Sequence, residues 1–122
     1  MMLSARFLDH FQNPRNVGQL DPPALQVEVS NPACGDILVL SALLEEGVFG
    51  EVRYQVRGCT ASIAAGSALT ELLLGKTPAA AAAISRDDVE AALDGLRNES
   101  KHVTALAVDA VRALVAAANP SR

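Results

Sequence analysis

The spacing of apolar residues changes from every second position to every third or fourth position at Gly58-Cys59. Residues 25–30 and 48–56 alternate apolar and polar side chains, and residues 37–44 between them are mostly apolar. Alternation puts one face of a strand against a core, whereas the later spacing is typical of amphipathic helices. Three strands in series followed by helices predict an α+β fold, in which a three-stranded antiparallel sheet is packed by helices.

Five helices are expected around this sheet. They are predicted over residues 4–12, 59–75, 77–84, 85–95 and 100–118. Ser4 is a typical cap for the first helix, Thr77-Pro78 a typical start for the third, and Asn119-Pro120 a typical stop for the last. Residues 15–23 contain turn residues and no apolar period, which indicates an irregular linker on the surface.

Composition bounds the number of domains and the class of partner. Half of the residues are hydrophobic, and 8 glycines plus 6 prolines make 14 of 122 positions, so we expect a single domain over residues 1–122. The net charge is -4 and the ten Lys and Arg residues form no run, which argues against nucleic acid as a partner. No apolar run reaches membrane-spanning length and residues 1–12 lack the apolar segment of a signal peptide, so we expect a cytoplasmic protein without a membrane partner. In a reducing compartment two cysteines are ligands or reactive thiols more often than a disulfide, although their spacing leaves a disulfide open.

The segment from Asn31 to Asp36 places a thiol two residues before a carboxylate. Pro32 favours extended geometry at Asn31, and Gly35 can adopt the positive φ that turns the chain sharply. Cys34 and Asp36 can therefore face one point. By itself this pattern is weak, because a free cysteine is more often a small buried hydrophobe than a ligand.

Two further candidates lie at the starts of predicted helices. Cys59 follows Gly58 at a strand-to-helix junction, where the helix dipole favours a thiolate; the alternative is a cysteine buried among apolar neighbours. His102 begins the last helix beside its apolar stripe, where an ordinary helix-end histidine is the alternative. Together Cys34, Asp36, Cys59 and His102 form a ligand set suited to zinc or iron, provided that they converge in space. His10, on the polar flank of the first helix, is interpreted as structural or solvated.

Three motifs resemble the IscU/NifU amino-terminal family of iron-sulfur cluster scaffolds. The segment from Asp9 to Gly18 resembles the family's opening motif, residues 32–36 its first ligand loop, and residues 58–64 its second. The resemblance spans nearly the whole chain. It implies the same three-stranded sheet with helices, and a scaffold or carrier rather than an enzyme.

The chain departs from this family at two places. The family's third cysteine follows a histidine at the start of the last long helix, and here that pair is His102-Val103. Valine keeps an apolar volume but cannot bind iron or accept sulfur. The segment through which an Hsp70-type chaperone recognises many such scaffolds corresponds to residues 96–100, which do not match it, so transfer assisted by that contact is not expected.

The leading hypothesis is a scaffold that binds a transient [2Fe-2S] cluster through Cys34, Asp36, Cys59 and His102. The resemblance implies that Cys59 accepts sulfur as a persulfide, that a cysteine desulfurase delivers it, and that apo iron-sulfur proteins receive the product. We expect a monomer or a weak homo-oligomer. One alternative is a zinc-bearing sulfur acceptor similar to the SUF-associated relatives, and another is a non-catalytic paralogue with a regulatory role.

Overall fold

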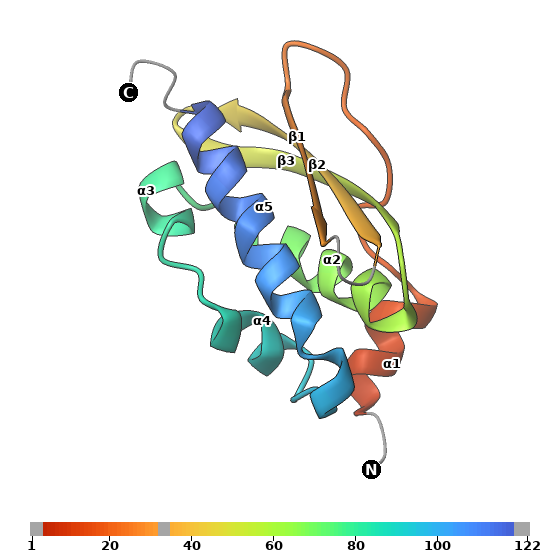
Figure 1. Ribbon diagram of the computed structural model, residues 1–122. Helices are drawn as coiled ribbons and strands as arrows, with labels where there is room; N and C mark the ends of the chain where they lie inside the picture. The colour runs from red at the N-terminus through yellow and green to blue at the C-terminus, as the bar shows by residue number, and fades with distance from the viewer. Residues whose placement is uncertain (1–3, 32–34, 119–122) are drawn as a thin grey trace.

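The computed structural model describes residues 4–31 and 35–118, and these residues form an α+β fold with one hydrophobic core. Figure 1 shows a small twisted sheet with helices packed against it. The elements in chain order are α1 (Ala5–Gln12), β1 (Leu25–Asn31), β2 (Asp36–Glu45), β3 (Val48–Arg57), α2 (Thr60–Leu73), α3 (Pro78–Ala81), α4 (Arg86–Ala92), the 3-10 helix η1 (Asn98–Ser100) and α5 (His102–Ala118). The predicted fold class is confirmed.

The sheet is a meander with the strand order β1-β2-β3, and both pairings are antiparallel. Glu46 and Gly47 connect β2 to β3 with φ values of 53° and 84°, so both adopt left-handed backbone conformations. A tight hairpin turn of this kind matches the right-handed twist of the flanking strands.

One face of the sheet carries the core. A row of apolar side chains crosses it at Val27, Leu40 and Tyr54, which are paired across the strands. Helices α2 and α5 cover this face (Figure 1). Tyr54 needs a glycine opposite it, because a Cβ atom at Gly66 of α2 would lie 2.3 Å from its ring.

The segment between α1 and β1 was predicted to be a linker, but it contributes to the sheet. Tyr54 donates its backbone N–H to the Asn16 carbonyl at 2.9 Å and accepts from the Gly18 N–H at 2.9 Å, so residues 16–18 pair with the free edge of β3. Farther on, the Leu20 N–H donates to Ser41 Oγ at 3.1 Å. The pairing of residues 16–18 with Tyr54 satisfies backbone groups of β3 that an open sheet edge would leave without hydrogen bonds.

The three α-helices that follow α2 are all shorter than predicted. The alanine-rich helix expected over residues 77–84 is only the single turn α3, although Thr77 caps it as predicted. Helix α4 begins after a capping box made by Ser85 and Asp88, and it ends before Gly95, whose φ is 95°. The last helix begins at His102 rather than near residue 100, because η1 precedes it. High helix propensity alone does not extend a short helix that lacks a continuous apolar face.

His10 is structural rather than solvated, because it is only 8% exposed. Its Nδ1 lies 2.8 Å from Ser67 Oγ, and its Nε2 lies 3.5 Å from a carboxylate oxygen of Glu71. Ser67 Oγ also accepts from the Arg15 backbone N–H, so its own proton is available to His10 Nδ1. Burial, with a smaller effect from the Arg15 guanidinium, lowers the pKa of His10.

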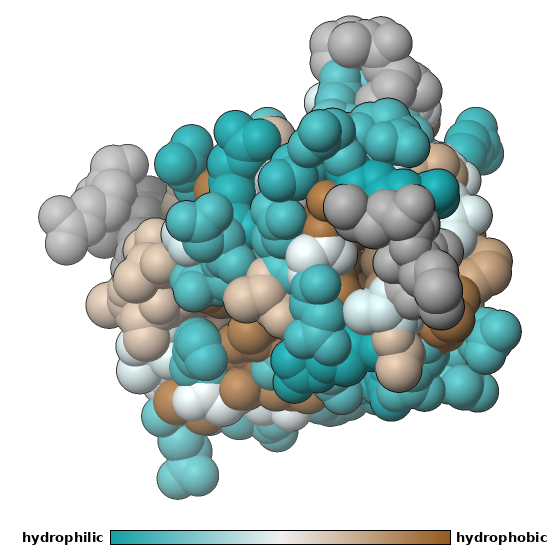
Figure 2. Space-filling view, turned by 90° about the horizontal axis from the view of Figure 1, so that it is seen from below, coloured by the Kyte–Doolittle hydropathy of each residue, from teal (hydrophilic) through white to brown (hydrophobic). Residues whose placement is uncertain are grey.

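No helix in the described part of the chain is both long and apolar enough to span a membrane. Seen from the end where α1 lies and α5 begins, the surface mixes hydrophilic side chains with small hydrophobic patches (Figure 2). Leu8 and Phe11 of α1 are the large apolar side chains most exposed on that helix.

Candidate metal site

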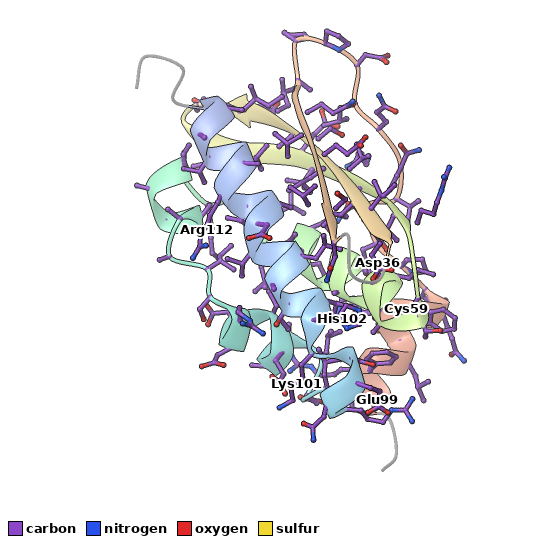
Figure 3. All side chains as sticks on the ribbon, viewed as in Figure 1. Asp36, Cys59, Glu99, Lys101, His102 and Arg112 are labelled. Carbon is purple, nitrogen blue, oxygen red and sulfur yellow. The ribbon has the colours of Figure 1, made fainter. Side chains whose placement is uncertain are left out.

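Three of the predicted ligands converge at one end of the sheet. Asp36 comes from the first position of β2, Cys59 from the residue before α2, and His102 from the first residue of α5 (Figure 3). One donor atom of each residue lies within 4.8 Å of the others. The Asp36 Oδ2 atom is 3.9 Å from Cys59 Sγ and 3.5 Å from His102 Nε2.

Asp36 is a buried carboxylate, with an exposed fraction of 4%. It lies on the covered face of the sheet, in line with Leu38 and Leu40, and pairs with Asn31 of β1. Ser62 donates its hydroxyl proton to Asp36 Oδ2 at 2.5 Å. The other side of the carboxylate rests against Gly58, where a Cβ atom would lie 2.6 Å from Oδ1. The carboxylate is therefore confined between a glycine and a serine.

Cys59 carries a free and exposed thiol, which contradicts its alternative interpretation as a buried core residue. Its backbone carbonyl accepts the Ser62 and Ile63 N–H groups at 3.0 and 3.2 Å, so it is the N-cap of α2. Its side chain makes no cap hydrogen bond to the first turn of α2. Sγ is also 3.4 Å from Ser62 Oγ.

His102 presents one ring nitrogen to the site. Nδ1 lies 3.1 Å from the Glu99 carbonyl oxygen, which can only accept, so Nδ1 carries the proton in this contact. Nε2 is buried and makes no hydrogen bond to any described residue. Nε2 lies 3.5 Å from Asp36 Oδ2, so the space between the two atoms accommodates either a proton on the imidazole or a metal ion bound by both residues.

The donor set fits one metal ion. Zinc bonds of about 2.0–2.3 Å at tetrahedral angles place neighbouring ligand atoms about 3.3–3.6 Å apart. The separations of 3.5 and 3.9 Å at Asp36 Oδ2 are close to that range. Sulfur, nitrogen and oxygen donors together suit zinc or iron rather than calcium or magnesium. The backbone carbonyl of Glu99 accepts a hydrogen bond from Nδ1, and a contact of this kind orients histidines that bind metals.

Cys34, the fourth predicted ligand, lies outside the described residues. The flanking residues close the hairpin, because the Gly35 N–H donates to the Asn31 carbonyl at 2.7 Å. Gly35 has a φ of 76°, which agrees with the sharp turn predicted there. Val103, at the position of the family's third cysteine, is 1% exposed and belongs to the hydrophobic core.

Sequence reasoning missed two residues that shape the site. Ser62 follows Cys59 by three positions at the start of a helix, a spacing that puts both side chains on one face. From this spacing Ser62 could have been predicted to lie beside Cys59. Gly58 was noticed only as a junction, and its close contact with Asp36 depends on how β3 lies beside β2, which no local pattern shows.

The sequence matches the model of the NifU-like N terminal domain over residues 2–119. The chain is 40% identical over 111 residues to the iron-sulfur cluster assembly scaffold protein IscU 1 of Archaeoglobus fulgidus, covering 91% of this chain and 72% of the relative. It is 37% identical over 120 residues to the iron-sulfur cluster assembly scaffold protein IscU of Escherichia coli, and the match covers 95% of this chain and 93% of the relative.

A solved structure shares the fold. The N-terminal part of a nitrogen-fixing NifU-like protein from Brucella abortus matches with a TM-score of 0.78 and 19% identity, over 98% of this chain and 95% of that one. At this identity the likeness concerns the fold alone. The match of the family model over nearly the whole sequence is the broader result, and the chain belongs to the family of NifU-like N-terminal domains.

Proposed function

We propose that this protein is an iron-sulfur cluster assembly scaffold or carrier that holds its cargo through Cys34, Asp36, Cys59 and His102. The observation that carries the proposal is that His102 Nε2, the buried Asp36 carboxylate and the exposed Cys59 thiol bring their donor atoms within 4.8 Å of one another. Two relatives that are 40% and 37% identical bear the name of such scaffolds, which supports the same role here. The role is that of a carrier in the cytoplasm rather than of an enzyme.

Cys59 is the proposed sulfur acceptor. Its sulfur is exposed and borders a surface pocket of about 300 Å³, whose lining includes Phe7, Leu96 and Arg97. A persulfide on a cysteine desulfurase would be attacked at its outer sulfur by the Cys59 thiolate. A new S–S bond forms on Cys59 while the donor's S–S bond breaks, and the donor cysteine leaves as a thiolate. Apo iron-sulfur proteins would then receive the finished cluster.

The ligand chemistry favours a cluster that is easily given up. With Val103 in place of a cysteine, the proposed set holds two thiolates, one imidazole and one carboxylate. Histidine ligation of an iron-sulfur cluster is known in Rieske-type centres, whereas a carboxylate is a harder ligand than the thiolate that iron-sulfur clusters usually have. A weakly held cluster suits a carrier that must pass it on.

A zinc-bearing sulfur acceptor is the second candidate, and the spacing of the donors favours it. The three described donor atoms lie within 4.8 Å of one another, which fits a single ion. A two-iron cluster divides its ligands between two metal atoms and would require the donors to spread apart. In this candidate the proposed ligands would hold a zinc ion, which would keep the Cys59 sulfur bound as a thiolate until a desulfurase arrives. A non-catalytic paralogue with a regulatory role is the remaining possibility if no metal binds.

The test is to measure iron, zinc and acid-labile sulfide in protein purified without oxygen. Cys59→Ser and His102→Ala remove two proposed ligands, and His10→Gln is the matched control because it removes the only other histidine. Iron with an equal amount of sulfide, lost in both ligand variants but kept in the control, supports the scaffold. Zinc without sulfide supports the sulfur acceptor instead. A parent protein without metal, before and after anaerobic reconstitution, refutes both.

A further inference from the structure

We propose that Ser62 is a positioning residue of the metal site, which fixes the Asp36 carboxylate for binding through one oxygen. The inference rests on the proposed function, since it assigns a role to a residue beside the same ligands. Ser62 is not one of the proposed ligands. Its side chain is buried, with an exposed fraction of 3%, yet it makes contacts only a polar group can make.

The hydroxyl of Ser62 contacts two of the ligand residues. Its Oγ donates to Asp36 Oδ2 at 2.5 Å and lies 3.4 Å from Cys59 Sγ. A hydroxyl has one proton and two lone pairs. With its proton on Asp36, Oγ can still accept from the Cys59 thiol, so one small side chain links the carboxylate to the sulfur.

The hydrogen bond from Ser62 determines which oxygen lone pairs of Asp36 remain available to bind a metal ion. Oδ2 receives the Ser62 proton on one side and faces His102 Nε2 on another, at 3.5 Å. The backbone of Gly58 lies close to Oδ1, since a Cβ atom added at this residue would lie only 2.6 Å from that oxygen. The carboxylate therefore cannot rotate freely, and Oδ2 is the oxygen turned towards the other donors.

Without the serine hydroxyl the carboxylate loses this constraint. An alanine at residue 62 keeps the helix but removes the short hydrogen bond to Asp36 Oδ2 and leaves only the longer contact from Cys59 Sγ at 3.9 Å, so the carboxylate can turn away from His102. Removing a hydrogen-bond partner of a ligating group costs about 10–100-fold in metal affinity in proteins generally. We expect a loss of that size here.

A matched control lies on the same helix. Ser67 is buried like Ser62, but its Oγ contacts His10 and the Arg15 backbone rather than the proposed ligands. Ser67→Ala removes a buried hydroxyl of the same size from α2. Any general effect of such a loss on folding is therefore present in this variant as well.

The experiment titrates the full chain with Zn²⁺ in competition with a chromophoric chelator, and with Co²⁺ to follow its visible and thiolate charge-transfer absorption. Ser62→Ala should bind about 10–100-fold more weakly and shift the visible Co²⁺ band. Ser62→Thr, which retains the hydroxyl, should restore affinity and spectrum, and Ser67→Ala should match the parent. Circular dichroism checks that each variant is folded.

Three outcomes would overturn the inference. Ser62→Ala binding as tightly as the parent removes the positioning role while leaving the proposed function intact. Equal losses in Ser62→Ala and Ser67→Ala indicate a general effect on α2 rather than control of Asp36. A parent protein that binds neither metal overturns this inference, whereas the iron and sulfide analysis after anaerobic reconstitution decides separately whether the proposed function stands.

Discussion

Replacing Gly58 with alanine tests whether the site depends on close packing behind Asp36. The backbone at Gly58 lies outside the left-handed region, so alanine is not disfavoured by its φ. The substitution is disfavoured because there is no room for the added methyl group. An added Cβ atom would lie 2.6 Å from Asp36 Oδ1, 2.7 Å from its Cγ and 3.0 Å from Ser62 Oγ.

The size of the effect follows from these distances. Ordinary contact begins at 3.4 Å, so the carboxylate oxygen must retreat by 3.4 − 2.6 = 0.8 Å. Asp36 is buried and short, and it cannot move that far and keep its 2.5 Å bond to Ser62. Overpacking of a buried site lowers the free energy of unfolding by about 1–3 kcal/mol. Replacing glycine with alanine raises it by about 0.4–1 kcal/mol, because the unfolded chain loses conformational entropy. We expect the free energy of unfolding to fall by about 1–2 kcal/mol and metal affinity to fall about 10–100-fold.

Urea unfolding of the metal-free protein and Zn²⁺ competition measure the two effects separately. The matched control is Gly50→Ala in β3. There a Cβ atom also meets a carboxylate, that of Glu45, but both residues are exposed and the long Glu45 side chain can swing into solvent. The control should keep the parent's stability and affinity. If Gly58→Ala behaves like Gly50→Ala in both measurements, the confinement of Asp36 is refuted.

Two further predictions concern buried titratable groups remote from the proposed ligands. Burial raises the pKa of Tyr54 to about 12, above the unfolded value of 10.0, so its contribution to stability is complete below pH 10 and lost as pH rises towards 12. Ionisation of Tyr54 therefore lowers the free energy of unfolding by about 2–3 kcal/mol across this pH range. Tyr54→Phe should lose about 0.5–1.5 kcal/mol at neutral pH, because the hydrogen bond to the Ile63 carbonyl is removed. In urea unfolding its stability should decline less steeply at alkaline pH than that of the parent. Superimposable declines above pH 10 would contradict this. For His10, burial first and the Arg15 charge second lower the pKa below 6.5, so its stabilising effect is present above pH 6.5 and lost as pH falls below that value. His10→Gln should therefore weaken the acid dependence of stability between pH 7 and 5, and an unchanged slope would show that another group causes it.

Much of the fold follows from local patterns. Alternation in β1 and β3 and the helical period after Cys59 are visible in the sequence because one face of each element is buried. Caps at Ser4 and Thr77 also act over one turn of chain. The helix boundaries near α3 and η1 were predicted less well, since short helices depend on packing more than on propensity.

Three of the candidate ligands that lie among the described residues were named from the sequence, but their geometry was not. The types of Asp36, Cys59 and His102, together with their motifs, pointed to metal before any contact was known. Their convergence joins three elements, and the direction of His102 Nε2 towards Asp36 becomes evident only in the structure, where Nδ1 contacts the Glu99 carbonyl.

The sequence by itself determined the meander, the helices that follow it and the residue types that offer sulfur, nitrogen and oxygen. These depend on periodicity and on side-chain chemistry, which are properties of short segments. Only the tertiary structure decided that residues 16–18 close the edge of β3, that Gly58 and Ser62 confine Asp36, and that His102 faces the same point. Those contacts join residues far apart in the chain, and the packing of α2 and α5 on the sheet brings them together.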